Sequence, residues 1–227
     1  MRLVEYGSYP QELVTDESII TELDSKSKKE SNEMKIELNG VKYAKVYPDL
    51  DPFSYGLKTF TNGEKIIQGK AYYFKYSPIK WIELEDTKLL SLYLLSSDLF
   101  DDNDFMPTTK FNKSSIKKKT IKNFIKHSFI DEGNSIYLPS LEILNSSEYG
   151  FEYGRGPQEQ RKAKLTDYAL ALGAYKEDES NCGIYWTMNE RSANELEIWV
   201  VDPDGDINSA VNTDSGICIR PILEKYV

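Results

Sequence analysis

Three aspartates at alternate positions form the most metal-like pattern in the sequence. Asp202, Asp204 and Asp206 stand in the run Asp-Pro-Asp-Gly-Asp, a spacing that directs carboxylate oxygens toward one hard cation, as in calcium-binding loops. The glycine takes the fourth position instead of the sixth, however, and Thr213 stands at position twelve in place of a glutamate. Pro-Asp-Gly between two strand-like runs is also a common turn sequence. The pattern therefore favours a hairpin turn, with a Ca²⁺ site as the alternative.

Lysines dominate the middle of the chain. Residues 110–126 contain seven lysines and no acid, a composition that can contact phosphates, with Phe111 and Phe124 available for base stacking. The whole chain nevertheless carries 28 Lys and Arg against 37 Asp and Glu, a formal net charge of −9 at pH 7. That balance opposes general binding to nucleic acid or to an anionic membrane. We therefore interpret the lysines as the solvated face of a helix, with Phe124 on its apolar side.

Residues for nucleophilic or metal chemistry are scarce. His127 is the only histidine, and Cys182 and Cys218 are the only cysteines. This scarcity excludes most Ser-His-Asp arrangements unless His127 is the base, and it excludes His-rich and CxxC zinc sites. His127 is expected to be a structural or surface histidine, near a helix C-terminus that favours the imidazolium form. The cysteines are expected to be buried free thiols, although the sequence leaves their pairing open.

Aromatic residues are abundant, with 16 Tyr, 9 Phe and 3 Trp. Tyr and Trp provide a large contact area at low entropic cost, which suits recognition surfaces. Loop-like positions hold Tyr55, Tyr149, Tyr153 and Tyr175. The glycine-bearing stretch 149–155 is the predicted ligand-facing loop, and it contributes Tyr149, Phe151, Tyr153 and Arg155. The tryptophans lie in strand-like runs that favour core positions: Trp81, Trp186 and Trp199.

The order of the predicted elements indicates an α+β fold. One helix is expected over 115–129, where the apolar residues share one face, and another over 166–173, from a Thr166 cap to Gly173. A short helix capped by Thr15 precedes a solvated loop at 24–35. Strands are expected at 41–47, 70–76, 79–84, 89–96, 183–188, 196–201 and 217–222. Stretches 145–160 and 208–215 are expected to be loops.

The length of 227 residues fits one large domain or two small ones, and we predict a single domain over residues 1–227. No run approaches the roughly 20 apolar residues of a membrane span. Glu5 interrupts the N-terminal stretch where an export signal needs an apolar core, so the chain as written is expected to be cytoplasmic. The sequence does not show whether an export signal was trimmed.

Several segments carry a resemblance through their order and spacing. They are GSYPQ (7–11), NGVKYAKV (39–46), PIKWIELE (78–85), LLSLYLLSSDLFD (89–101), SSIKKKTIKNFIKHSF (114–129), YLPSLEIL (137–144), TDYALALG (166–173), YWTM (185–188) and GICIRPIL (216–223). Together they resemble a bacterial family of unknown function, number 6273 among the domains of unknown function. The resemblance implies a C-type-lectin-like fold shared with formylglycine-generating enzymes. Such a fold has a twisted antiparallel sheet, two main helices, and paired N- and C-terminal strands.

The chain also departs from this family. Relatives commonly carry a tryptophan where Phe111 and Asn112 stand, and an arginine two residues after the second aromatic of a late pair, where Trp186 is followed by Met188. If that arginine binds a ligand in relatives, this chain has either lost it or replaced it with Arg191. Trp186 and Arg191 are included among the predicted ligand-binding residues. The closely spaced cysteine pair that binds copper in the enzymes is absent, and so are the sugar-coordinating tripeptides of calcium-dependent lectins.

The sequence and the resemblance together predict non-catalytic recognition of a protein, peptide or glycan. We expect no cofactor other than the alternative Ca²⁺ at Asp202, Asp204 and Asp206. One rival reading is an enzyme on a formylglycine-generating-enzyme-like scaffold, and another is an accessory component of a larger bacterial or phage assembly. The ligand, the oligomeric state and the pathway are not encoded in any pattern of the sequence.

Overall fold

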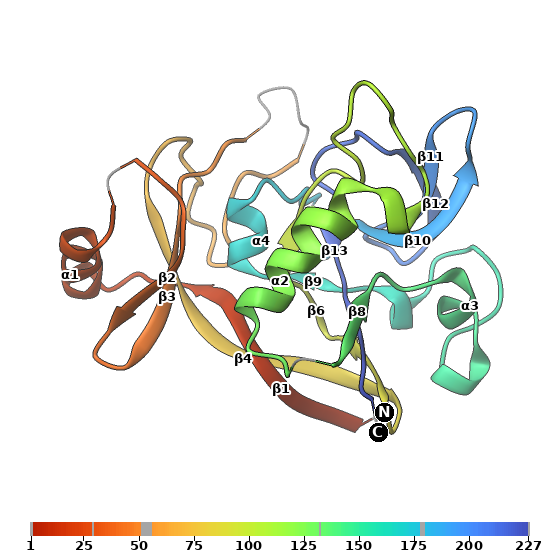
Figure 1. The fold of residues 1–227 in the computed structure, drawn as a ribbon, viewed down its shortest axis with the longest axis horizontal. Helices are drawn as coiled ribbons and strands as arrows, with labels where there is room; N and C mark the ends of the chain where they lie inside the picture. The colour runs from red at the N-terminus through yellow and green to blue at the C-terminus, as the bar shows by residue number, and fades with distance from the viewer. Residues whose placement is uncertain (1, 29, 51–55, 132, 178–179, 227) are drawn as a thin grey trace.

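The computed structural model describes residues 2–28, 30–50, 56–131, 133–177 and 180–226. Within them, strands and short helical segments build a mixed α+β architecture (Figure 1). The strands are β1 (Arg2–Leu13), β2 (Glu33–Leu38), β3 (Val41–Val46), β4 (Tyr72–Glu85), β5 (Lys88–Ser91), β6 (Tyr93–Leu94), β7 (Ser96–Ser97), β8 (Ser135–Tyr137), β9 (Lys164–Leu165), β10 (Tyr185–Ser192), β11 (Glu197–Val201), β12 (Ile207–Val211), β13 (Cys218–Ile219) and β14 (Ile222–Glu224). The helical segments are α1 (Glu17–Lys26), η1 (Phe111–Lys113), η2 (Ile116–Ile121), α2 (Lys122–His127), α3 (Leu141–Leu144), η3 (Ser147–Tyr149), η4 (Glu159–Arg161) and α4 (Asp167–Ala171).

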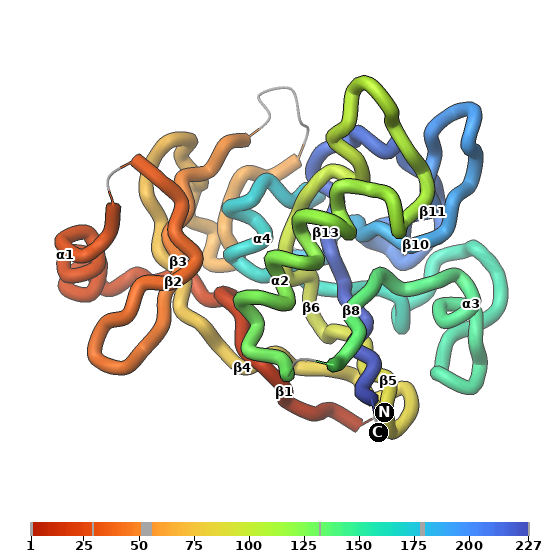
Figure 2. Tube along the Cα trace, viewed as in Figure 1, coloured from red at the N-terminus to blue at the C-terminus, as the bar shows by residue number. Residues whose placement is uncertain are grey.

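A large antiparallel sheet forms one side of the molecule. Its strand order in the described residues is β2-β3-β4-β5-β14-β8, and β1 pairs with β4 along most of the length of both strands (Figure 2). The expected direct pairing of the N- and C-terminal strands is wrong, because β4 and β5 lie between β1 and β14. The two ends still meet at one end of this sheet, where Lys225 Nζ lies 5.4 Å from the centre of the Tyr6 ring.

Two irregularities bend β1 and shape its surface. The ladder with β4 shifts register between Glu5 and Ser8 and again between Pro10 and Glu12. Gly7 lies in the first shift with φ +69°, and a Cβ there would stand 2.7 Å from the carbonyl oxygen of Ser128, so the close approach to α2 requires glycine. Beside this bulge, β4 passes through Pro78 without a break. The two strands predicted at 70–76 and 79–84 are therefore one.

A second sheet has the order β12-β11-β10-β13-β7, in which only β10 and β13 are parallel among the described pairings. β6 and β9 form a short parallel pair of their own. One hydrophobic core extends through both sheets and includes Trp81 and Trp186, each 0% exposed. A smaller core, centred on Leu23 and Tyr73, fills the space between α1 and the β2–β4 region.

The helix termini follow local capping chemistry. Asp16, not the predicted Thr15, caps α1, because its carboxylate accepts bonds from the backbone N–H groups of Ser18 at 2.8 Å and Ile19 at 3.3 Å. Thr166 caps α4 as predicted, with Oγ1 accepting from Ala169 N–H at 3.2 Å. The predicted central helix begins as the π-helical η2 and continues as α2. Among the helices of the described segments, none combines the length and hydrophobicity that crossing a bilayer demands.

Several predicted boundaries are wrong. The loop expected at 24–35 is shortened by the end of α1 and the start of β2, and the loop expected at 208–215 contains most of β12, which pairs with β11. The strand expected at 89–96 is divided into β5, β6 and β7, which belong to three different sheets. The closing strand at 217–222 likewise divides into β13 and β14. The resemblance implied an N-terminal strand, but the residue pattern did not predict the extent of β1.

Candidate functional site

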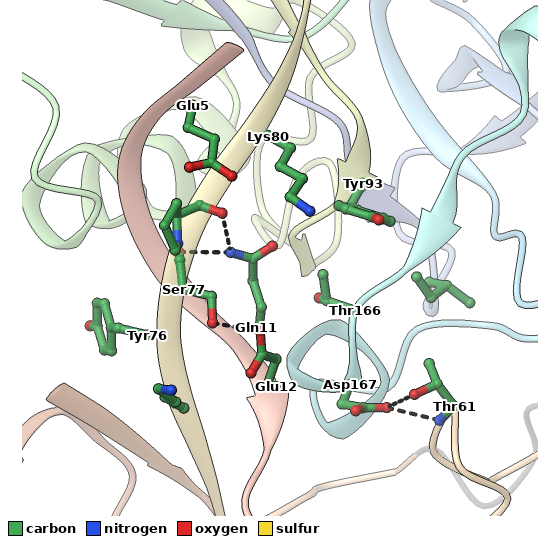
Figure 3. Close-up of a pocket in the computed structure, with 13 residues that line it drawn as sticks. Glu5, Gln11, Glu12, Thr61, Tyr76, Ser77, Lys80, Tyr93, Thr166 and Asp167 are labelled. Carbon is green, nitrogen blue, oxygen red and sulfur yellow. Dashed lines mark hydrogen bonds between the residues drawn. The ribbon is translucent and has the colours of Figure 1, made fainter. Parts of the chain in front are cut away.

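A pocket of about 490 Å³ opens between the paired strands β1 and β4 on one side and β6, β9 and the start of α4 on the other (Figure 3). Its walls carry charges of both signs beside hydroxyl, amide and aromatic groups. The lining residues that matter below are Glu5, Gln11, Lys80, Tyr93, Thr166 and Asp167. They come from three distant parts of the chain, and the fold alone brings them together.

Gln11 is the most constrained polar group in this pocket. Its side chain is only 8% exposed, and its Nε2 donates to the carbonyl oxygens of Ser77 at 2.8 Å and Pro78 at 3.2 Å. Because both of these partners are acceptors, the NH₂ end of the amide must face them. Gln11 Oε1 therefore points into the pocket, and it has no protein donor among the residues that the structure describes. This oxygen is a fixed acceptor that needs a donor from water or a ligand.

Lys80 and Tyr93 present donors to the same space. The Lys80 ammonium extends toward the Tyr93 ring, and the Gln11 amide oxygen is directed toward the gap between them (Figure 3). Lys80 lies opposite Glu5 in the β1–β4 ladder. No ion pair joins these two side chains among the residues that the structure describes, although opposite charges at such positions usually attract. Both charges are therefore free to meet a ligand.

The opposite wall is built by the start of α4. Thr166 Oγ1 donates to the carbonyl oxygen of Leu94 at 3.0 Å, which fixes α4 against β6. Asp167 Oδ1 accepts from both the backbone N–H and the hydroxyl of Thr61, each at 2.8 Å. Asp167 thus ties the 58–66 loop to the pocket rim and holds this wall in place.

The predicted ligand-facing loop is only partly available to a ligand. Phe151 and Trp186 are 2% and 0% exposed, so the prediction that they face a ligand is corrected: both fill the core. Tyr149 bonds through its hydroxyl to Glu85 and is half-buried. Tyr153 is 92% exposed. The loop-like tyrosine Tyr55 lies outside the described residues.

Arg155 and Arg191 meet across the face of one aromatic ring. Their guanidinium carbons lie 5.3 Å and 5.6 Å from the centre of the Trp199 ring, which places two predicted ligand-binding residues beside the half-buried Trp199. Arg191 also pairs with Glu197 and donates to Ser209 Oγ at 3.2 Å. This cluster sits on the outer face of β10 and β11, where acidic groups compete for the arginines.

Sequence reasoning missed Arg161, which organises the predicted loop. It is 0% exposed, and its guanidinium donates to the carbonyl oxygens of Leu144 at 2.9 Å, Glu152 at 2.8 Å and Gly154 at 2.6 Å. It also reaches the Gly156 carbonyl and the side chain of Asn145. A buried cation that binds successive carbonyls fixes the backbone around Arg155. The only sequence signal for this role of Arg161 was its place just after the glycine-rich stretch.

The 202–206 segment forms the favoured hairpin turn between β11 and β12. The backbone N–H of Gly205 donates to the Asp202 carbonyl at 2.9 Å, and Asp202 N–H donates to the Asp206 carbonyl at 2.9 Å. Within the described chain, no group of three or more acidic, histidine or cysteine side chains has the arrangement of a metal site. Burial, with the nearby Asp204 and Asp206 charges adding to it, raises the pKa of Asp202 despite its bond from Asn208.

The lysine run is largely exposed, as predicted for a solvated face, and several of its lysines also have partners. Lys110 pairs with Glu190 at 2.9 Å, Lys119 pairs with Asp102 at 2.5 Å, and Lys117 Nζ donates to the Ile136 carbonyl at 3.0 Å. Phe124 is core, as predicted, and Phe111 is also buried. Neither aromatic is therefore available for stacking on a base.

The helix C-terminus was expected to favour the protonated imidazolium form of His127, but the surroundings of this side chain disfavour that form. Burial and the neighbouring Lys126 and Lys35 charges lower its pKa, so they outweigh any effect of the helix end. Cys182 and Cys218 are free and buried, as expected.

Comparisons with known protein families, with curated proteins and with solved structures found no match for this chain. The function must therefore be argued from the site itself.

Proposed function

We propose that this protein is a non-catalytic recognition domain that binds a small polar ligand, of peptide or glycan type, in the pocket between β1, β4 and the start of α4. The observation that carries the proposal is the fixed orientation of Gln11, which holds Oε1 in the pocket as an unpartnered acceptor among the described residues. A volume of about 490 Å³ falls in the range of ligand pockets.

The chemistry of the lining favours binding over turnover. The described lining residues offer hydrogen-bond donors, acceptors and both signs of charge, but they include neither cysteine nor histidine. A buried polar group such as the Gln11 amide selects a ligand, because a ligand that leaves it unpaired loses affinity. Asp167 and Thr61 hold one wall, and the β1–β4 ladder holds the other, so the pocket is largely formed before a ligand arrives.

The test is a thermal-shift titration with dipeptides and monosaccharides at millimolar concentration. A ligand that binds only the folded state raises the melting temperature in a saturable way. We expect at least one probe to do so for the native protein and for Gln68→Met, which makes the same chemical change on the exposed surface. The response should be lost in Gln11→Met and weakened in Lys80→Met.

Lys80→Met keeps the test valid if Gln11→Met folds poorly, since Lys80 is exposed and its removal leaves no buried group unpaired. An equal melting-temperature response in the native protein and Lys80→Met would place binding elsewhere and overturn the proposal. So would the absence of a saturable response to every probe.

A further inference from the structure

We infer that the ligand of this pocket is a zwitterion, with an ammonium and a carboxylate group as in a free dipeptide; this inference rests on the proposed function and specifies its ligand. The pocket lining combines donors, on Lys80 and Tyr93, with acceptors, on Glu5 and the Gln11 amide oxygen (Figure 3). A ligand with both kinds of group matches this lining.

Glu5 and Lys80 provide the strongest argument. They are partners in the β1–β4 register, yet their side chains diverge instead of pairing, and Lys80 extends toward Tyr93. Neither side chain has an ion-pair partner elsewhere in the described segments. A ligand carboxylate at Lys80 and a ligand ammonium at Glu5 would each gain a charge-assisted hydrogen bond.

The Gln11 amide oxygen is an acceptor with a more tightly fixed position than the Glu5 carboxylate. Its Oε1 cannot turn away, because Nε2 is held by the carbonyls of Ser77 and Pro78. An ammonium group offers three donors, so one ligand group can bond to both Gln11 Oε1 and the Glu5 carboxylate. Tyr93 Oη, which is half-buried and has no partner in the described residues, can donate to the carboxylate beside Lys80.

Other ligand classes fit this lining less well. The charged side chains around the pocket are Glu5, Glu12, Lys75, Lys80 and Asp167. A purely anionic ligand would be repelled by the acidic members and by the formal net charge of −9. A neutral sugar would take water from Lys80 and Glu5 without supplying opposite charges. A zwitterion adds no net charge and pairs with both.

The experiment is calorimetric titration with four forms of one ligand at pH 7. These are L-alanyl-L-alanine, its N-acetyl form, its C-terminal amide, and the doubly blocked form. We expect blocking either end to weaken binding about tenfold or more, because one charge-assisted bond is lost at each end. The doubly blocked form should bind most weakly.

Two variants assign the ends. Lys80→Met should bind the dipeptide and its C-terminal amide equally, while it still discriminates against the N-acetyl form. Glu5→Gln should bind the dipeptide and its N-acetyl form equally, while it still discriminates against the C-terminal amide. Lys113→Met, an exposed lysine on η1, is the matched control and should keep the native preferences. This crossover separates charge recognition at a defined end from a general change in the pocket.

The outcomes distinguish the two proposals. Equal binding of the doubly blocked and free dipeptides, lost in Gln11→Met, would overturn the zwitterion and leave the pocket as the binding site. If Lys80→Met instead removed the discrimination against the N-acetyl form, and Glu5→Gln removed the discrimination against the C-terminal amide, the inferred orientation of the ligand would also be overturned. No binding of any form, together with unchanged side-chain NH₂ resonances of Gln11, would overturn the zwitterion, and the wider probe panel described above would then decide the proposed function.

Discussion

Arg161 is the residue whose loss should most damage the second half of the fold. In Arg161→Met, five hydrogen bonds disappear, to the carbonyls of Leu144, Glu152, Gly154 and Gly156 and to the side chain of Asn145. Only the bond to Leu144 is fully buried, so that carbonyl loses its partner without access to water, at a cost of about 2 kcal/mol. The others lie nearer solvent and cost less.

The net loss should be about 3 kcal/mol. Removing the guanidinium also relieves the cost of burying a charge, which offsets part of the lost hydrogen bonding. A loss of this size is a large fraction of the 5–15 kcal/mol typical of a folded domain. Arg161→Lys should fall between the native protein and Arg161→Met, because an ammonium has three donors and cannot serve five acceptors.

The assay is urea unfolding combined with limited trypsin digestion. Trypsin should cut Arg161→Met faster at Arg155, because the backbone on both sides of Arg155 is held by Arg161 through Gly154 and Gly156. Arg155→Met is the stability control, since it removes a guanidinium whose main contact is the Trp199 ring and should cost under about 1 kcal/mol. A loss below about 1 kcal/mol in Arg161→Met, with unchanged cleavage, would refute the role assigned to Arg161.

Two further predictions concern the 202–206 turn. Gly205→Ala should destabilise the protein strongly in urea unfolding, because the new Cβ would stand 2.0 Å from the Gln158 carbonyl oxygen at a residue with φ +86°; an unchanged midpoint would contradict this packing. Asp202→Asn should raise the free energy of unfolding at pH 7 by a few tenths to about 1 kcal/mol. The pKa of the Asp202 carboxyl is higher in the folded state than in the unfolded state, so the native protein loses stability as the pH rises from below the unfolded-state pKa through the folded-state pKa. The asparagine variant has no such loss. The gain should vanish below about pH 4, and a gain that persists there would show that charge is not its cause.

The sequence predicted the parts of the fold that depend on local chemistry. Thr166 and Gly173 delimit α4 because capping and the left-handed conformation are local requirements, and Gly173 has φ +89°. The residue pattern did not predict the extent of β1, because its two register shifts interrupt the alternation of buried and exposed residues. Pro78 suggested a break in β4, but the neighbouring strand bends at the same place and accommodates it.

The candidate pocket could not be predicted because none of its residues belongs to a motif. In the sequence, Gln11 is an ordinary polar residue. Its orientation is fixed only by its hydrogen bonds to the carbonyls of Ser77 and Pro78, and those contacts depend on the register of β1 and β4. Phe151 was misassigned because aromatic residues suit binding surfaces and cores equally, and only the tertiary packing decides between them. The strand-like run around Trp186 correctly favoured the core, and only its inclusion among the ligand-binding residues was wrong.

The position of the pocket follows from how β1 is held. The bulge at Gly7 brings β1 against α2, and the second register shift precedes Glu12, so the segment between the two irregularities is anchored at both ends. Gln11 lies at the end of that segment, and its amide bonds bridge to β4 just where Pro78 supplies no N–H of its own. The same irregularities that obscured the extent of β1 in the sequence thus place a fixed acceptor at the pocket wall, a geometry that suits the proposed binding of a polar ligand.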